Sequence, residues 1–155
     1  MRLAVPVKLK KLNDKAQIPV YMTDGAAALD LVATEIEYLD ENKVIVKFGF
    51  ASEFNNQYKI LLQPRSSFTF KSWIMANSPA IIDSDYRGEW QVRFEAVPVA
   101  VHNETFKMIY EEFPYKVGDR IVQATIEVNV HLKAKFVEDL SDSVRAEGGF
   151  GSTGK

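Results

Sequence analysis

Hydrophobic and polar residues alternate over residues 125–136. A polar side chain separates each apolar residue from the next, and the apolar positions are Ile126, Val128, Val130, Leu132, Ala134 and Phe136. A period of two places all of these side chains on one face of an extended chain. The pattern therefore predicts a half-buried strand over residues 125–136.

The same alternation marks the beginning of the chain, at Leu3, Val5, Val7 and Leu9. Pro6 falls on the opposite face and cannot donate a ladder hydrogen bond, which favours an edge strand. Further β-rich runs occupy residues 43–50, 57–62 and 90–96, and no segment keeps helical spacing over three turns. These patterns predict an all-β fold, a sandwich or a barrel.

Length and composition predict one β domain followed by a tail. The chain has 155 residues, of which 46% are hydrophobic, enough for one sizeable core. Residues 1–140 are expected to form this domain, with an extended segment at about 89–117. Four of the eight glycines fall within residues 148–154, and residues 141–155 offer no apolar face to bury. We therefore expect a flexible C-terminal arm over residues 141–155.

The charge balance and the lack of cysteine exclude several classes of function. There are 19 basic and 21 acidic residues, a net charge of −2, so no whole-molecule field attracts a polyanion or a membrane. The absence of cysteine excludes disulfides, thiolate zinc sites and a cysteine nucleophile. His102 and His131 are isolated, and we expect both to be ordinary surface histidines.

Neither a targeting segment nor a membrane span is evident. Residues 1–11 lack the apolar core of a signal peptide, and no run approaches the roughly 18 apolar residues of a membrane span. The sequence therefore predicts a soluble protein of the cytoplasm, the host cytoplasm if it is virus-encoded.

Candidate chemistry is densest in residues 77–89. Asp83 and Asp85 stand two residues apart beside Tyr86 and Arg87. The two carboxylates share one face of a strand or bracket a tight turn. Such a segment is either a polar hairpin turn or the place of a general base that acts on water.

Two further segments carry groups that suit phosphate, although each is weak evidence alone. Arg65, Ser66 and Ser67 follow the apolar run 60–62, and an arginine fork with hydroxyl donors matches phosphate oxygens. The tetrapeptide Pro-Arg-Ser-Ser at residues 64–67 also occurs in many ordinary loops. Residues 118–123 can likewise be a turn that leads into a strand, with Arg120 in a structural ion pair.

The C-terminal arm carries the most specific group of residues. Its glycines allow backbone amides to approach phosphates, Ser152 and Thr153 add donors, and Arg145 adds positive charge. Phe150 is a lone aromatic residue available to stack on a base. A simple flexible tail would not explain an arginine and a phenylalanine in this segment.

Together, five segments in this order resemble the five motifs of the trimeric all-β deoxyuridine triphosphatase (dUTPase) family: residues 25–31, 64–67, 77–89, 118–123 and 145–154. The third and fifth are the most specific. The resemblance implies a β jelly roll assembled as a homotrimer, in which all three subunits contribute to each active site. It also implies hydrolysis of dUTP to dUMP and pyrophosphate with Mg²⁺.

The resemblance assigns roles to individual residues. Asp83 would orient and deprotonate the attacking water, Tyr86 would lie under the deoxyribose and block a 2′-hydroxyl, and Asn77 with the neighbouring backbone would pair with uracil. Asp30 and Gln123 would contact Mg²⁺ only through water, since the three phosphates would chelate the metal. The remaining substrate-binding residues would be Arg65, Ser66, Ser67, Gln123, Arg145, Phe150, Gly151, Ser152 and Thr153.

The chain departs from the family pattern at Ala28, at Pro79-Ala80, where the family more often has an apolar residue and glycine, and in the length of residues 89–117. Ala28 stands where the family usually has glycine, so the backbone there is expected to avoid positive φ. Residues 89–117 form a longer connection than in compact members, which is either an extra hairpin or a surface for a protein partner.

Three other functions compete with the dUTPase interpretation: a dCTP deaminase-like nucleotide enzyme, a nucleotide-gated binding protein that acts through residues 89–117, and a structural jelly-roll protein. The arm and the Tyr86 hairpin favour the phosphatase.

Overall fold

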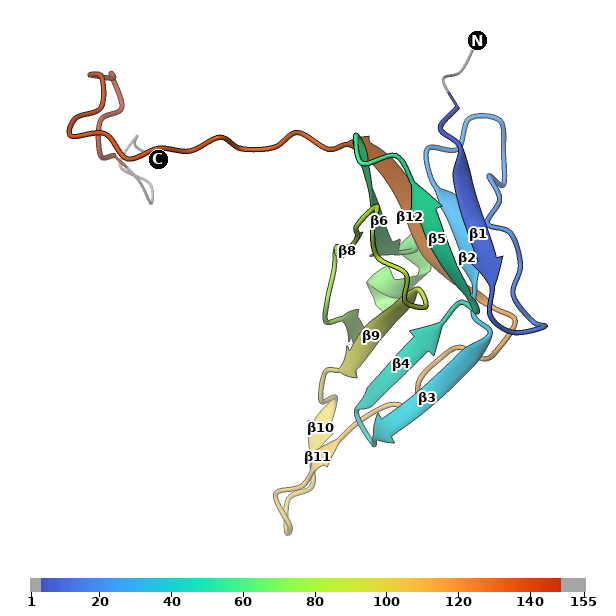
Figure 1. Ribbon diagram of the computed structural model, residues 1–155. Coiled ribbons are helices and arrows are strands. Elements are labelled where there is room, and N and C mark those ends of the chain that lie inside the picture. The colour runs from blue at the N-terminus through green and yellow to red at the C-terminus, as the bar shows by residue number, and fades with distance from the viewer. Residues whose placement is uncertain (1–3, 149–155) are drawn as a thin grey trace.

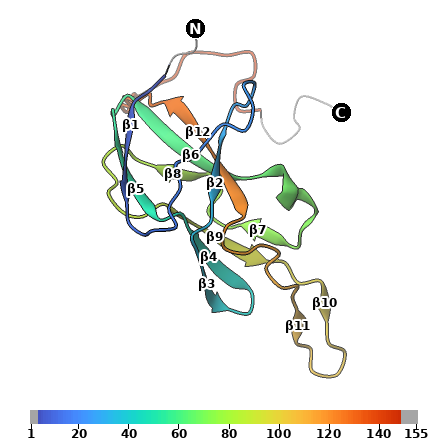
Figure 2. The same cartoon turned by 90° about the vertical axis from the view of Figure 1, so that its right-hand side faces the viewer.

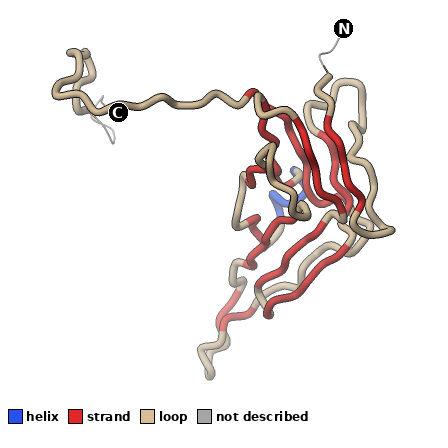
Figure 3. The backbone as a smooth tube through the Cα atoms, viewed as in Figure 1, coloured by secondary structure: helices blue, strands red, loops and turns tan. Residues whose placement is uncertain are grey.

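The computed structural model describes residues 4–148, and its regular structure is almost entirely β (Figure 1). Figure 3 shows one short helical segment among the strands, the 3₁₀ helix η1 (Ser66–Phe70). Within the described range, no helix has the length and apolar character needed to cross a membrane. The prediction of an all-β fold is confirmed.

Two four-stranded antiparallel sheets make up most of the body, and two smaller two-stranded sheets flank them. The first large sheet has the order β2 (Leu29–Val32), β12 (Arg120–Val128), β6 (Tyr58–Pro64), β8 (Ala80–Ile82). The second has the order β3 (Glu35–Asp40), β4 (Lys43–Lys47), β9 (Gln91–Ala96), β7 (Trp73–Met75). The smaller sheets pair β1 (Val7–Lys11) with β5 (Phe50–Phe54), and β10 (Ala100–Val101) with β11 (Met108–Ile109).

The core follows from the alternation of the central strands. In β9 every second residue is buried, and the same holds for β4. A strand with this pattern presents one apolar face, which must pack against another apolar face. The largest fully buried side chains are Phe48, Phe94, Leu31, Leu62, Ile121, Val44, Val46, Val92 and Val122.

The predicted strand over residues 43–50 is in fact two strands in different sheets. β4 ends at Lys47 and β5 begins at Phe50, with Gly49 between them at a φ of +75°. A Cβ at Gly49 would lie 2.7 Å from Asn13 Nδ2, so both the backbone angle and the close approach require glycine. The apolar residues continue on both sides of this turn, so the composition of residues 43–50 did not indicate where one strand ends and the next begins.

The prediction of a half-buried strand over residues 125–136 is wrong beyond Val128. Val128 pairs with Tyr58, the first residue of β6, and the Asn129 N–H donates to Gln57 O at 2.7 Å. Beyond this point the chain leaves the body in an extended form (Figure 1). Val130, Leu132 and Phe136 are 83%, 91% and 107% exposed, because within residues 4–148 no strand lies beside them.

The extension at residues 89–117 contains an additional hairpin, formed by β10 and β11, which projects from the body (Figure 2). Its exposed apolar residues include Val99, Val101, Phe106 and Met108. The structure thus has the extra hairpin, and a protein partner for this surface stays a prediction.

Candidate functional site

The Asp83 segment forms a tight turn at the end of β8. The Tyr86 N–H donates to Asp83 O at 3.1 Å, and the Asp83 side chain is exposed. Asp83 lines a pocket of about 540 Å³ together with Asn77, Ile82 and Tyr86, whereas Asp85 does not line it. Among the described residues, the Asp83 carboxylate forms neither an ion pair nor a side-chain hydrogen bond, so it is free to accept one from water.

Several contacts fix this turn against β5. Arg87 Nη1 donates to Ser84 O at 2.8 Å and to Ser52 O at 3.2 Å. Trp90 Nε1 donates to Ser52 Oγ at 3.0 Å, and Trp90 is 3% exposed. A buried indole and an arginine that spans two backbone segments restrict the turn, and they therefore hold Asp83 at a defined place.

Tyr86 lies over the turn because residue 88 is glycine. Its hydroxyl donates to Glu89 O at 3.2 Å, and the residue is 40% exposed. A Cβ at Gly88 would collide with the Tyr86 hydroxyl and ring. Asn77 is also held in this region, since its Oδ1 accepts a hydrogen bond from Arg93 N at 3.0 Å.

A second pocket, of about 680 Å³, gathers residues from three of the predicted segments. Asp30 on β2, Gln123 on β12 and Gln63 on β6 stand opposite one another in the register of the sheet. Arg65, Ser66 and Arg120 also line this pocket. The sheet thus brings together the first, second and fourth segments.

The lining of this pocket includes a buried carboxylate that contacts two arginine side chains. Asp30 is 8% exposed, and its Oδ2 lies 3.3 Å from Arg65 Nε and 3.4 Å from Arg120 Nη1. Arg65 Nη1 also donates to Arg120 O at 2.9 Å. One negative and two positive groups leave a net positive charge, and arginine forks suit phosphate oxygens.

Arg120 is the residue that the sequence analysis missed. A structural ion pair was only one of the two interpretations of residues 118–123, and the structure places Arg120 in an ion pair with Asp30 inside the candidate phosphate pocket. Its position three residues before Gln123 could have pointed to this pocket. The sequence alone did not show that β12 pairs with β2 at this register.

The donor set around Asp30 fits a cation held through water. The structure, over residues 4–148, contains no group of three histidine, cysteine, aspartate or glutamate side chains suited to binding a metal ion directly. Asp30 Oδ2 has no hydrogen-bond partner in the described part of the chain. The Asp30 carboxylate and the Gln123 amide oxygen can therefore accept hydrogen bonds from the water shell of Mg²⁺, an ion that loses water reluctantly.

One chain does not bring the two pockets together. They share no lining residue. Ile82 pairs with Ile60, so Asp83 lies at one end of β6 while Arg65 follows its other end. Five residues of extended strand span roughly 17 Å. The Asp83 carboxylate and the Arg65 guanidinium of the same chain therefore belong to separate surfaces.

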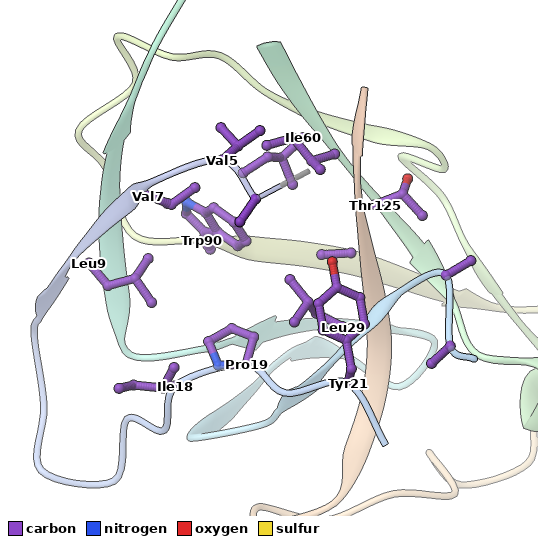
Figure 4. Close-up of a pocket in the computed structure, with 15 residues that line it drawn as sticks. Val5, Val7, Leu9, Ile18, Pro19, Tyr21, Leu29, Ile60, Trp90 and Thr125 are labelled. Carbon is purple, nitrogen blue, oxygen red and sulfur yellow. The ribbon is translucent and has the colours of Figure 1, made fainter. Parts of the chain in front are cut away.

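A third, apolar groove of about 510 Å³ runs between β1, β2 and β12 (Figure 4). Val5, Val7, Leu9, Ile18, Leu29 and Trp90 point into it. No charged side chain lines the groove in the described structure, so it does not suit a triphosphate.

The predicted arm residues lie apart from all three pockets or outside the described range. Arg145 Nε donates to Gly148 O at 2.7 Å, at the far end of the extended segment (Figure 1). Phe150, Gly151, Ser152 and Thr153 lie outside the described residues. Elsewhere, His102 and His131 are exposed, and Ala28 has no positive φ, as predicted.

Comparison with known proteins decides the family. The dUTPase family model matches residues 14–154. The chain belongs to the dUTPase family. The match includes all five segments singled out in the sequence, and it favours the dUTPase interpretation over the dCTP deaminase.

Curated relatives resemble the chain over nearly its whole length. A deoxyuridine 5′-triphosphate nucleotidohydrolase of Nautilia profundicola is 40% identical over 151 residues, which cover 96% of this chain and 99% of the relative. The enzyme of the same name from Crocosphaera subtropica is 37% identical over 150 residues, 96% of this chain and 98% of the relative.

Solved dUTPase structures share the fold. A Staphylococcus bacteriophage 80alpha dUTPase bound to dUpNHpp has a TM-score of 0.76 at 23% identity, with 97% of this chain and 99% of that chain covered. A mutant dUTPase of phage phi11 of S. aureus, described with a structural Mg(II) ion, has a TM-score of 0.70 at 19% identity. The match covers 88% of this chain and 99% of that chain.

Proposed function

We propose that this dUTPase-family protein hydrolyses dUTP to dUMP and pyrophosphate, by attack of water on the α-phosphorus. The observation that carries the proposal is the pair of preformed surfaces, one with an exposed carboxylate in a tight turn and one with two arginines around a buried carboxylate. The family match and the relatives named as dUTP nucleotidohydrolases support the same reaction.

In this mechanism Asp83 accepts a proton from the attacking water. Its carboxylate is exposed, while Arg87 and Trp90 hold the backbone of the turn. A general base needs hydrogen-bond reach to the water and a fixed place from which to act. Tyr86 and Asn77 of the same pocket would contact the deoxyribose and the uracil.

The second surface would bind the triphosphate. Arg65, Arg120 and Ser66 line it, and Gln123 lies in register with Asp30. The arginines remain in place without substrate because each contacts Asp30. This arrangement reduces the reorganisation needed when phosphate arrives, and the positive charge stabilises charge that develops on the leaving pyrophosphate.

Mg²⁺ is the proposed cofactor, with Asp30 and Gln123 in contact with its water shell. When bound, the metal would neutralise phosphate charge and help to hold the triphosphate in a reactive geometry.

The separation of the two surfaces supports a homotrimer in which neighbouring subunits complete each site. The exposed apolar residues of the tail and the apolar groove support it further, since each lacks a complementary surface among the described residues of one chain. A symmetric ring of subunits would place one chain's Asp83 turn against the next chain's arginines. Residues 141–155, with Arg145 and Phe150, would then close over the nucleotide.

The function is tested by incubating the protein and Mg²⁺ with dUTP, dCTP, dTTP, dATP, dGTP or UTP and measuring pyrophosphate. We expect pyrophosphate from dUTP and at least roughly 10²-fold less from each competitor, because a site that pairs polar groups with one base discriminates strongly. Release of ammonia from dCTP, or equal hydrolysis of all six, would contradict the proposal.

Tyr86 is expected to decide between deoxyribose and ribose. Tyr86→Ala should raise the ratio of kcat/KM for UTP to that for dUTP by roughly 10-fold or more, since it opens space for a 2′-hydroxyl. Gly88→Ala should change the ratio in the same direction, because its Cβ would displace the Tyr86 ring. Tyr86→Phe keeps the ring and serves as the control. An unchanged ratio in Tyr86→Ala would place sugar discrimination elsewhere.

A further inference from the structure

Residues 110–115, which return from the β10–β11 hairpin to the body, are anchored beside the candidate phosphate pocket. Trp73 Nε1 donates to Glu111 O at 3.0 Å, and Ser72 Oγ donates to Glu111 Oε2 at 2.7 Å. Phe113 is 7% exposed, and its ring meets Trp73 edge-on with centroids 5.1 Å apart. This return segment is therefore part of the core, unlike the tip of the hairpin.

The return segment packs against η1, a helix with few internal restraints. η1 follows Arg65 directly and has no side-chain cap. At its start the Phe68 N–H donates to Arg65 O at 3.0 Å, and at its end the Lys71 N–H donates to Phe68 O at 3.0 Å. Helices this short are not stable by themselves. The position of η1 must therefore depend on its tertiary contacts.

Tyr115 holds η1 at two points. Its hydroxyl lies 2.7 Å from Ser67 Oγ, and its ring centroid lies 4.7 Å from that of Phe68. Phe68 is buried and stacks in turn on Phe94, with centroids 4.6 Å apart and an interplanar angle of 8°. One tyrosine thus contacts both the exposed serine and the buried phenylalanine of the helix.

The two serines of η1 face different partners. Ser66 lines the pocket that contains Asp30 and Arg65, whereas Ser67 does not line it and is bonded to Tyr115 instead. Because Arg65 and Ser66 are consecutive with Ser67, a shift of Ser67 would move both relative to Asp30.

We propose that Tyr115 is a positioning residue for triphosphate binding, and that the Ser67 hydroxyl serves this contact rather than the nucleotide. The inference rests on the proposed function, since it concerns the same phosphate surface. It also assigns a role to the extension at residues 89–117, whose return segment braces the turn that carries Arg65 and Ser66.

The test removes the hydroxyl and keeps the ring. Tyr115→Phe should raise the KM for dUTP, and the Kd of a non-hydrolysable dUTP analogue, by roughly 3- to 10-fold, the range expected for one hydrogen bond. The kcat should stay within about twofold, since Tyr115 does not touch the reacting atoms. The affinity for deoxyuridine, which has no phosphate, should not change. Ser67→Ala should reproduce this result. The variant that carries both substitutions should lose no more affinity for the analogue than either single variant, because both remove the same contact.

Tyr110→Phe is the matched control, because Tyr110 is on the same segment and its hydroxyl has no hydrogen-bond partner within residues 4–148. It should bind the analogue like the unmodified protein. Additive losses in the double variant, or an equal loss of deoxyuridine affinity, would overturn the positioning role. If the unmodified protein does not hydrolyse dUTP, the proposed function fails, and the analogue titrations still test Tyr115. If it does hydrolyse dUTP and Tyr115→Phe binds the analogue normally, only the positioning role fails.

Discussion

Asp83→Asn is expected to lower the turnover of dUTP by about 10²-fold or more and to leave nucleotide affinity nearly unchanged. The amide cannot accept a proton from water as a carboxylate does, and a positioned general base contributes on this scale. The backbone of the turn should persist, since Arg87 and Trp90 hold it independently of the Asp83 side chain. The measurements are pyrophosphate release at saturating dUTP and the Kd of a non-hydrolysable dUTP analogue.

Asp85→Asn is the matched control for this prediction. Asp85 lies in the same exposed turn but does not line the pocket of Asp83. Its variant should therefore lose much less turnover than Asp83→Asn. Near-normal turnover in Asp83→Asn, or an equal loss in both variants, would remove Asp83 from the role of base.

Mixing two inactive variants tests whether the sites are shared. Asp83→Asn keeps the arginine surface, and Arg65→Ala keeps the Asp83 turn. If each site takes these surfaces from two neighbours in a ring of three, co-refolding equal amounts should restore about a quarter of the sites by random assembly. Sites contained within single chains would give no recovery.

The second large effect is expected from the tail. Replacing both Leu132 and Phe136 by serine should convert the proposed trimer to a monomer that has lost nearly all turnover. These side chains are 91% and 107% exposed in the single chain, so nothing in the described fold of that chain depends on them. Burial of each side chain against a neighbouring subunit would stabilise the trimer by about 1.5 to 3 kcal/mol. The six side chains, two from each of three subunits, would sum to roughly 9 to 18 kcal/mol per trimer as an upper estimate.

Sedimentation equilibrium measures this outcome against the chain mass of 17.5 kDa. The unmodified protein should give about three times that mass. Lys133→Ser with Lys135→Ser is the control, because both lysines lie on the opposite face of the same extended segment. It should remain trimeric and active. An active monomer, or a trimer that tolerates the Leu132 and Phe136 replacements, would refute the proposed contact.

The class of fold and much of the candidate chemistry follow from local patterns in the sequence. β-rich composition is a local property, and it correctly indicated the strands β6 and β9, although the alternating burial appears in β9 and not in β6, where Ile60, Leu61 and Leu62 are all buried. The order of the five segments was also local information, and it was enough to suggest the dUTPase family that the family model then matched. Even the departure at Ala28 could be interpreted locally, since it concerns a single backbone angle.

Features that depend on partners distant in sequence became clear only from the three-dimensional packing. An alternating segment has an apolar face whether or not anything covers it, so the pattern could not show that pairing ends at Val128 and leaves Leu132 exposed. Arg120 could not be placed beside Asp30 until the register of β12 on β2 was known. Ser66 and Ser67 looked equivalent in sequence, and only the packing of Tyr115 on η1 separated them. Local spacing specifies which face a side chain occupies, whereas its partner is chosen by contacts among strands that lie far apart along the chain.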